Sequence, residues 1–490
     1  MPKVYNSLTR KKEELKPGQN KKLRIFVCGP TVYDWSHIGH ARTYIVFDAM
    51  VRYWGSLGFD VFYLQNITDI DDKIIQRAQE QGQDPLTLAD TFAEYYFEDM
   101  NALGIRSVSK YAKATDYIKE IISQVQRLEK QGYAYVIEDG VYYDVTKFKR
   151  YGKLSGRTSQ GAEDAISRID ESVQKKHKGD FALWKYSKPG EPSWPFDSPS
   201  TSSGSLRVKA GRPGWHIEDT AITEKEFGEQ YDVHGGARDL LFPHHEAEIA
   251  QMEALSGKEP LVRYWLHAGF LTVEGEKMSK SLGNFITIKE FIKEHSARAM
   301  RLLILGCHYR SPVDYSSVLV QQTEQDLKRI DEFLDKLQHT TNDKRLTTKN
   351  KQETVHKLLV VSHQSFVKAL EDDFNTPKAI ASLFNLIRSI NPLLSNNELG
   401  KEGAEAILKF LEKADEIFGF LFWGREEIKE APAEIQTLLE EREEARRLNN
   451  WNKADELRDR ILEAGWQIDD TSDGPRLKKK WGFAKNTPKE

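Results

Sequence analysis

Two neighbouring histidines and two carboxylates stand together in the stretch FPHHEAEIAQ, residues 242–251. His244 and Glu248 are four residues apart, so they project from one face if this stretch is helical. Imidazole nitrogen and carboxylate oxygen are both ordinary zinc ligands, and a zinc site needs about four ligands. The stretch therefore offers half of a metal site. The alternative is a solvated helix start, in which Pro243 occupies the first turn and the carboxylates favour the positive end of the helix dipole.

A pattern suited to nucleotide binding lies in CGPTVYDWSHIGHARTY, residues 28–44. The apolar run before it is typical of a strand, glycine and proline then turn the chain, and a helix is expected to begin near residues 37–40. The N-terminus of a helix beside the end of a strand binds phosphate through its free N–H groups and its dipole. Gly39 allows a nucleotide to approach the backbone, and His37 and His40 add donors aimed at the phosphates.

Two lysines stand in the glycine-flanked stretch EGEKMSKSLGNF, residues 274–285. A loop of this composition can bring Lys277 and Lys280 to a polyphosphate and stabilise the charge on a leaving pyrophosphate. The alternative is a solvated basic loop. The histidines of the first stretch, the lysines of the second and the order of the two stretches along the chain together favour a nucleotide-binding function.

Strands and helices alternate around these stretches. LRIFVC and DVFYLQNI are expected strands, separated by the expected helix ARTYIVFDAMVRYWGSLG, which is a βαβ unit and predicts a parallel sheet. Residues 110–207 have a mixed pattern and a loop rich in Pro, Gly and Ser, which indicates an insertion. A second α/β stretch runs from about residue 211 to residue 273.

The rest of the chain is expected to be helical. After about Ser316 an apolar stripe at helical spacing is formed by Leu319, Leu327, Ile330, Phe333, Leu334 and Leu337. Thr376 and Pro377 resemble a helix cap followed by proline at the first position. From about Pro432 the pattern predicts a charged helical hairpin that ends in a basic tail.

Composition limits the class of protein. The chain has 490 residues with 39% hydrophobic content, enough for several domains. Only Cys28 and Cys307 occur, which excludes a disulfide scaffold and suits a reducing compartment. We find no signal segment and no apolar run near the ~20 residues of a membrane span, so a cytoplasmic protein is expected. The net charge of -4 leaves nucleic-acid contacts to local patches.

The stretches HIGH and KMSKS, matched letter for letter, resemble the two signatures of class I aminoacyl-tRNA synthetases. The stretches NITDIDDKI, GRPGWHIE, FPHHEAEIAQ, EKMSKSLGNF and DDFNTP resemble cysteinyl-tRNA synthetases in particular, and the resemblance covers nearly the whole chain. It implies an α/β fold in which a Rossmann-like parallel-sheet catalytic domain is split by an insertion and followed by an all-α bundle and a small anticodon-binding domain. The implied bounds are 1–113 and 206–265 for the catalytic domain, 114–205 for the insertion, 266–318 for the KMSKS and stem-contact region, 319–428 for the bundle and 432–490 for the anticodon-binding domain.

The resemblance also implies one zinc ion per chain, bound by Cys28, His244 and Glu248, with the substrate thiolate as a further ligand. The fourth family ligand is a second cysteine, but where the family pattern is WHIEC this chain has WHIED. Asp219 therefore takes its place, and we hypothesise that it binds the zinc, since a carboxylate is an ordinary ligand with the same charge as a thiolate. In the competing interpretation Asp219 faces outward and the metal is weak or absent. His245 and Glu246 are expected to be neighbours of the site.

The implied substrates are L-cysteine, ATP with Mg²⁺, and cysteine tRNA, with no obligate protein partner and no membrane. The cysteine pocket would hold Cys28, Gly29, Thr68, Trp215 and His244. The ATP site would hold Gly39, His40, Gly236, Asp239 and Lys280, with His37, His40, Lys277 and Lys280 acting on the phosphates. The anticodon would be contacted by Trp451, Asp455 and Arg458. The third glycine of the family pattern HGGG is Ala237 here.

Three other functions remain open at this point. A ligase that joins activated cysteine to an amino sugar would share the catalytic half but lack the anticodon end, which this chain keeps. A metallohydrolase would use His244 and Glu248 but leave both nucleotide signatures unexplained. A non-catalytic RNA-binding paralogue would not need the histidine pair and the lysine loop, and both are intact.

Overall fold

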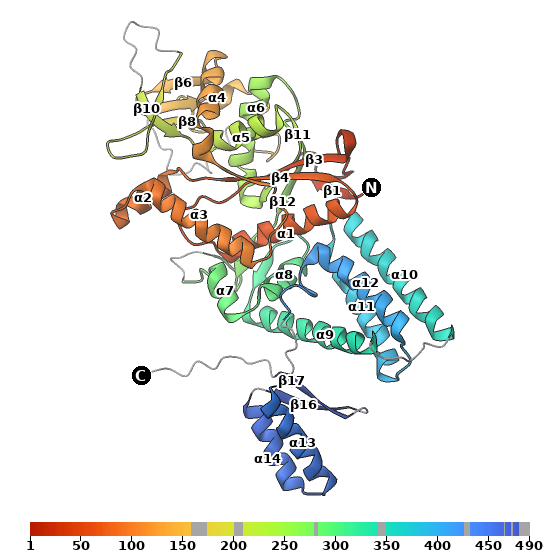
Figure 1. The fold of residues 1–490 in the computed structure, drawn as a ribbon. Coiled ribbons are helices and arrows are strands. Elements are labelled where there is room, and N and C mark those ends of the chain that lie inside the picture. The colour runs from red at the N-terminus through yellow and green to blue at the C-terminus, as the bar shows by residue number, and fades with distance from the viewer. Residues whose placement is uncertain are drawn as a thin grey trace. The chain divides into compact units, whose positions relative to one another are not determined.

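A parallel sheet of five strands organises residues Met1–Gly424, which form one compact unit of the chain, and residues Arg425–Glu490 form another (Figure 1). The computed structural model describes residues 1–157, 174–199, 209–278, 283–341, 349–425, 432–464, 466–471 and 474–479. In these parts of the chain no helix combines the length and the apolar character needed to cross a membrane.

The strands of the parallel sheet lie in the order β12, β11, β3, β4, β5. Their bounds are Lys22–Val27 for β3, Asp60–Ile67 for β4, Lys110–Lys113 for β5, Tyr231–Ala237 for β11 and Val262–Ala268 for β12. All neighbouring pairs are parallel, as the predicted βαβ unit requires. After β3 the chain forms β4 on one side of β3, and it later returns to form β11 on the opposite side of β3. Strand order therefore reverses between β3 and β11, and ligands of open α/β sheets bind in the crevice at such a point.

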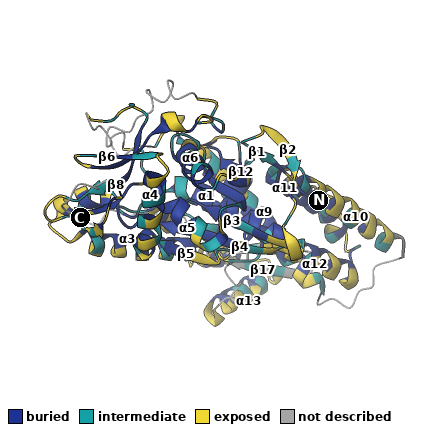
Figure 2. Ribbon diagram, turned by 90° about the horizontal axis from the view of Figure 1, so that it is seen from above, coloured by how far each residue is buried: buried dark blue, intermediate teal, exposed yellow. Residues whose placement is uncertain are grey.

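Helices cover both faces of this sheet (Figure 1). They are α1 (Ile38–Ser56), α2 (Asp72–Gln81), α3 (Pro85–Ala102), α5 (Ile217–Phe227) and α6 (His244–Ser256). Because side chains alternate along a strand, Ile25 and Val27 belong to the core that contains α1, whereas Phe26 and Cys28 belong to the core that contains α5 and α6. The buried strands form the dark centre of the molecule in Figure 2. Cys28 is thereby placed beneath α5 and α6.

The insertion between β5 and α5 has its own antiparallel sheet, in the order β6, β7, β8, β10, β9. Its strands are β6 (Ala134–Ile137), β7 (Gly140–Tyr143), β8 (Phe181–Tyr186), β9 (Trp194–Phe196) and β10 (Lys209–Pro213), preceded by α4 (Ile118–Lys130). In the described part of residues 110–213, the mixed pattern is therefore an antiparallel sheet flanked by α4.

Short strands and helices connect the parallel sheet to a helical bundle. The connecting elements are β13 (Leu271–Val273), β14 (Glu276–Lys277), α7 (Ile288–Glu294), α8 (Ala297–Leu305) and β15 (Val313–Tyr315), and a hairpin of β1 (Lys3–Asn6) and β2 (Lys11–Glu14) begins the chain. The bundle comprises α9 (Ser317–Thr341), α10 (Lys349–Glu371), α11 (Thr376–Ser395) and α12 (Lys401–Phe418).

The apolar stripe predicted for α9 is confirmed. Its members from Leu327 to Leu337 are buried, and Leu319 is partly buried against the same core. The predicted cap of α11 is wrong by one residue, because the side chain of Asn375 accepts the N–H of Lys378 while Thr376 is already helical. Asparagine caps a helix as well as threonine does.

The second unit contains the predicted helical hairpin, α13 (Ala433–Arg447) and α14 (Trp451–Glu463). The basic tail expected after it begins instead as a strand pair, β16 (Trp466–Thr471) and β17 (Gly474–Lys479). Trp466, together with the partly buried Ile468 and Leu477, packs on the apolar side of the helices. This apolar contact explains why strands form in a segment whose charge pattern did not predict them.

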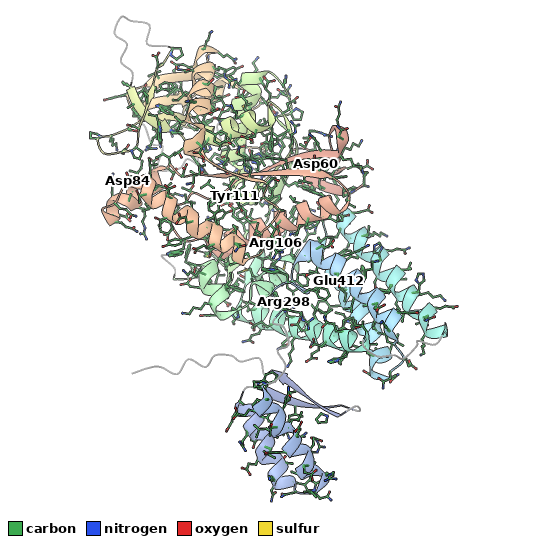
Figure 3. All side chains as sticks on the ribbon, viewed as in Figure 1. Asp60, Asp84, Arg106, Tyr111, Arg298 and Glu412 are labelled. Atoms are coloured by element: carbon green, nitrogen blue, oxygen red, sulfur yellow. The ribbon has the colours of Figure 1, made fainter. Side chains whose placement is uncertain are left out.

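Buried arginines of α8 join the parallel sheet to the bundle. The Arg301 guanidinium donates to the carbonyls of Phe418 and Leu103 and to the carboxylate of Asp48. Arg298, labelled in Figure 3, donates to the carbonyls of Phe420 and Leu421 and pairs with Asp331. Buried arginine is retained only when its donors are satisfied, so these contacts fix α8 against both parts.

Gly104 allows a close approach at the same junction. It has φ +69°, and a Cβ added there would lie 2.8 Å from the ring of Trp423. Both residues line a cavity of about 680 Å³ together with Arg106 and Glu412, which Figure 3 labels.

Replacing Gly104 with alanine is expected to destabilise the first unit. The left-handed backbone alone costs roughly 1–2 kcal/mol, and displacement of the Trp423 ring adds about 1–3 kcal/mol. Gly58→Ala is the matched control, because Gly58 has φ +79° but only the Lys21 amine within 4 Å. Calorimetry should show a larger fall in melting temperature for Gly104→Ala, and equal falls would contradict the role of the Trp423 contact.

Candidate active site and metal centre

The ends of β3 and β4 carry the loops that build the site. The Cys28 N–H donates to the Gly235 carbonyl of β11 at 3.1 Å, and the Val32 N–H donates to the Thr68 carbonyl at 3.1 Å. A Cβ at Gly29 would lie 1.7 Å from the carbonyl oxygen of Asn66. Only glycine permits this approach of the two loops, so Gly29 has a structural reason to stand beside Cys28.

The two signature histidines cap the helix that follows. His37 is the N-cap of α1, and its Nδ1 accepts the Gly39 N–H at 3.1 Å; the Nδ1 of His40 accepts the His37 N–H at 3.3 Å. Because the Nδ1 of each ring accepts a hydrogen bond, the ring proton available for donation lies on Nε2. Burial, and secondarily the neighbouring His37, lowers the pKa of His40 well below its usual value. His40 is therefore a neutral ring beside the helix N-terminus. Its Nε2–H is the group that could act as the predicted donor.

The predicted metal ligands meet in one buried cluster. Each of Cys28, Asp219, His244 and Glu248 offers a ligand atom, and these atoms lie within 4.8 Å of one another. The Nε2 of His244 lies 2.9 Å from Asp219 Oδ2 and 3.3 Å from Glu248 Oε1. Asp219 is fully buried and faces this cluster, as our hypothesis requires.

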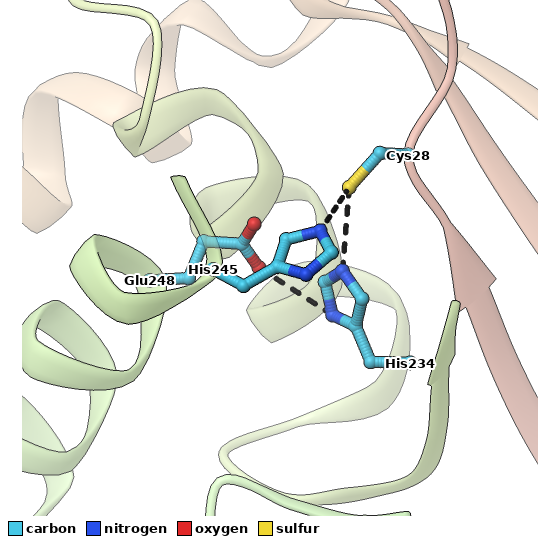
Figure 4. Close-up of side chains that lie close together, drawn as sticks. All are labelled: Cys28, His234, His245 and Glu248. Carbon is cyan, nitrogen blue, oxygen red and sulfur yellow. Dashed lines mark hydrogen bonds and ion pairs between the residues drawn. The ribbon is translucent and has the colours of Figure 1, made fainter. Parts of the chain in front are cut away.

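A second set of possible ligands shares two of these residues. Cys28 and Glu248 also lie within 4.8 Å of ligand atoms of His234 and His245. The Sγ of Cys28 is 3.1 Å from His245 Nε2 and 3.3 Å from His234 Nε2 (Figure 4). Burial lowers the pKa of both histidines well below the usual value, so both rings are neutral and chemically able to bind a metal.

The chemistry of the cluster fits a divalent cation. Burial is the main cause that raises the pKa of the Cys28 thiol, and the nearby charges of Asp219 and Glu248 raise it further. Burial and then Asp219 and Glu218 raise the pKa of Glu248. The buried atoms Asp219 Oδ1 and Glu248 Oε1 accept no hydrogen bond. Buried acids without a compensating cation are costly, and zinc ligands of these types would remove that cost.

Neighbouring side chains orient His244. Its Nδ1 lies 2.8 Å from His216 Nδ1, so the opposite nitrogen faces Asp219 and Glu248. The ring of Trp215 stacks on His244 with centroids 4.3 Å apart, and this tryptophan is 37% exposed. Trp215 thus lies between the cluster and the surface, where a pocket wall is expected.

The other predicted residues occupy different surroundings. The hydroxyl of buried Thr68 donates to the carboxylate of buried Glu218. Gly236 faces the ring of His245, since a Cβ there would lie 2.8 Å from its Cε1. Asp239 and Lys277 are exposed, whereas Lys280 lies outside the described residues. The carboxylate of Glu246 accepts hydrogen bonds from the N–H groups of Leu154 and Ser155. Glu246 therefore binds the backbone of the insertion.

Sequence reasoning missed His216, Glu218 and His234, which surround the cluster. It predicted His245 as a neighbour of the site, but not its contact with the sulfur of Cys28. His216 and Glu218 precede Asp219 in the stretch WHIED, and their spacing gives little sign of their contacts with His244 and Thr68. His234 precedes Gly235 and Gly236 on β11 and lies opposite Phe26 of β3, two residues before Cys28. Only the pairing of these two strands, which the sequence does not state, brings His234 to the Cys28 sulfur.

The residues predicted to contact tRNA lie in the second unit. Trp451, Asp455 and Arg458 are exposed on α14, with Trp451 57% exposed, while Ala454, Leu457 and Ile461 form the buried side of the same helix. Spacings of four and three residues place the three exposed side chains on one face.

Comparison with known proteins agrees with this organisation. Residues 14–325 match the family of class I (C) tRNA synthetase catalytic domains, residues 365–422 match the DALR domain, and residues 429–474 match the cysteinyl-tRNA ligase anticodon binding domain. The chain is 42% identical to the cysteine–tRNA ligase of Thermococcus onnurineus, over 96% of this chain and 98% of the relative. It is 44% identical to that of Pyrococcus abyssi, over 96% and 97% of the two chains.

The chain belongs to the cysteine–tRNA ligase family. Its resemblance to cysteinyl-tRNA synthetases is thereby confirmed, and the chain is an aminoacyl-tRNA synthetase. Membership in the cysteine–tRNA ligase family disfavours the metallohydrolase, and the match over residues 429–474 disfavours the amino-sugar ligase without an anticodon end.

Solved structures of other synthetases share the fold. The methionyl-tRNA synthetase of Mycobacterium tuberculosis with methionyl-adenylate has a TM-score of 0.56 at 15% identity, covering 82% of this chain and 88% of that one. The LeuRS of Agrobacterium radiobacter K84, in a ternary complex with tRNA and LeuAMS, has a TM-score of 0.61 at 12% identity, covering 82% and 84%. These likenesses confirm the class I α/β architecture of the cysteine–tRNA ligase family member described here.

Proposed function

We propose that this chain activates L-cysteine with ATP to cysteinyl-adenylate, releases pyrophosphate, and transfers cysteine to the 3′-terminal adenosine of its tRNA. The observation that carries the proposal is the position of the Cys28 cluster. It lies at the end of β3, where the strand order reverses, and the capped N-terminus of α1 follows within the same connection.

We assign one zinc ion to Cys28, Asp219, His244 and Glu248. When bound, zinc supplies a Lewis acid that takes the substrate thiol as thiolate, and this distinguishes cysteine from serine, which a hydrophobic pocket rejects poorly. Trp215 holds the ring of His244 from the open side. Thr68 and Glu218 form a polar wall next to Asp219, suited to the amino group of cysteine because Glu218 is acidic.

Activation itself requires mainly positioning and charge stabilisation. The substrate carboxylate attacks the α-phosphate of Mg-ATP in line, and the bond to pyrophosphate breaks. The Nε2–H groups of His37 and His40 donate to phosphate oxygens beside the N-terminus of α1. Lys277 and Lys280 stabilise the charge on the leaving pyrophosphate, while Gly39, Gly236 and Asp239 border the nucleotide.

The exposed face of α14 is proposed to contact the anticodon. Unpaired bases are bound by stacking on aromatic rings and by hydrogen bonds to their edges. Trp451 offers an exposed ring, and Asp455 and Arg458 offer an acceptor and donors on the same face. A cytoplasmic location follows from this role in protein synthesis and from the reduced state that Cys28 needs as a ligand.

The test is cysteine-dependent exchange of pyrophosphate into ATP, followed by transfer of labelled cysteine to tRNA. We expect both reactions with cysteine, and exchange with serine weaker by roughly 10⁴-fold. Exchange without transfer to tRNA, but with transfer to an amino sugar, would favour the alternative ligase. Binding of tRNA without exchange would identify a non-catalytic paralogue.

A further inference from the structure

An aromatic pair with a lysine lies beside the segment that follows the lysine loop. The rings of Trp35 and Tyr95 stack with centroids 4.3 Å apart and planes 16° apart. Phe92 meets each of them edge-on, at 5.9 Å. The Nζ of Lys289 lies 4.9 Å from the centroid of Trp35 and 5.9 Å from that of Tyr95. These distances are within the range of cation–π attraction.

The three residues come from three different elements. Trp35 lies in the loop before α1, Tyr95 is on α3, and Lys289 is in the first turn of α7. Among the described residues Lys289 forms no ion pair. Its charge nevertheless acts on Asp99 of α3, since burial raises the pKa of that carboxyl to about 6 and Lys289 opposes the rise. The lysine is thus held by ring faces.

A short backbone ladder runs between the same elements. The Ile38 N–H donates to the Ile286 carbonyl at 3.1 Å, and the Ile288 N–H donates to the Ser36 carbonyl at 2.9 Å. His37 and Thr287 form the antiparallel bridge between these bonds. Trp35 directly precedes one side of the ladder and Lys289 directly follows the other. The contact between Lys289 and Trp35 therefore continues the backbone ladder through a pair of side chains.

The ladder reaches the residues proposed to act on ATP. The ring of Phe285 meets the ring of His37 edge-on at 5.3 Å. The side-chain amide of Asn284 donates to the Lys277 carbonyl at 3.3 Å. Residues 284–288 therefore connect Lys277 to the cap of α1, and a shift of this segment would move the lysine relative to the histidine pair.

We propose that Trp35, Tyr95 and Lys289 are positioning residues that clasp residues 285–288 against the first turn of α1 and so align Lys277 with His37 and His40. The inference rests on the roles proposed above for these three groups toward ATP. The clasp touches no substrate, and acts through the ladder.

The experiment measures cysteine-dependent pyrophosphate exchange per active site, with active sites counted by adenylate burst. Lys289→Ala and Trp35→Leu should each lower kcat by about 3- to 30-fold, the range of one cation–π contact, while KM for cysteine changes less than about twofold. Lys289→Arg should restore most of the rate, because guanidinium also stacks on tryptophan. The double variant Trp35→Leu/Lys289→Ala should be no slower than the slower single variant.

Lys73→Ala is the control, because the Lys73 amine lies 5.5 Å from the ring of Tyr33 in the same loop, and neither residue belongs to the ladder between residues 36–38 and 286–288. It should exchange at the wild-type rate. Additive losses in the double variant, or equal losses for Lys289→Ala and Lys73→Ala, would overturn the clasp. Wild-type protein without any exchange would instead overturn the proposed function.

Discussion

Replacing Asp219 with alanine is expected to release the metal and to lower cysteine-dependent exchange by about 10³-fold. A Lewis acid supplies several kcal/mol of stabilisation, and about 4 kcal/mol corresponds to such a loss. Wild-type protein purified without added zinc should hold close to one equivalent. Asp219→Cys, which restores the usual two-thiolate donor set, should keep the metal. Metal analysis and exchange rates on the same preparations provide the measurement.

The overlapping ligand set supplies the decisive comparison for Asp219. If His234 and His245 only surround the sulfur of Cys28, then His245→Gln should retain the zinc that Asp219→Ala loses. The reverse result, with zinc lost from His245→Gln and kept by Asp219→Ala, would assign the metal to Cys28, His234, His245 and Glu248. A wild-type zinc content below about half an equivalent, with full activity in chelator, would exclude both sets.

Replacing Lys280 with alanine is expected to slow adenylate formation by about 10²- to 10³-fold. Removing one group that stabilises transition-state charge in an active site has an effect of this size. Because the lysine acts on pyrophosphate and not on cysteine, KM for cysteine should change little. Single-turnover formation of the adenylate measures the step directly.

Lys258→Ala provides the control for Lys280→Ala. Lys258 is an exposed lysine that pairs with Glu229, and its removal should leave the rate unchanged. Equal effects of Lys280→Ala on adenylate formation and on cysteine binding would contradict the assignment. The assignment of Lys280, which lies outside the described residues, comes from its place in the stretch KMSKS.

Local patterns were sufficient to predict the parts of the site that depend on short spacing. The interval of four between His244 and Glu248 places both on one face of α6, and the strand, turn and helix around Cys28 form as expected. The α/β fold class is confirmed for the same reason, since alternating strands and helices permit few other arrangements.

Contacts between distant strands could not be predicted in this way. His234 reaches Cys28 because β11 pairs with β3, and a sequence does not state which strands are neighbours. The capping contacts of His37 and His40 also depend on where the helix begins, which is the least certain feature of a helical pattern. In the second unit, apolar residues too sparse to mark a strand nevertheless pack as β16 and β17.

The buried arginines of α8 have a consequence for how this chain can be divided. Arg298 and Arg301 use carbonyl acceptors between Phe418 and Leu421, roughly a hundred residues beyond the end of the nucleotide-binding half. A shortened enzyme that ends before the bundle would lose these acceptors and Asp331, and with them the contacts that hold α8 against the bundle. The smallest portion that can be produced as an independent catalyst is therefore expected to extend past Leu421, although every group proposed to touch ATP or cysteine lies before α9.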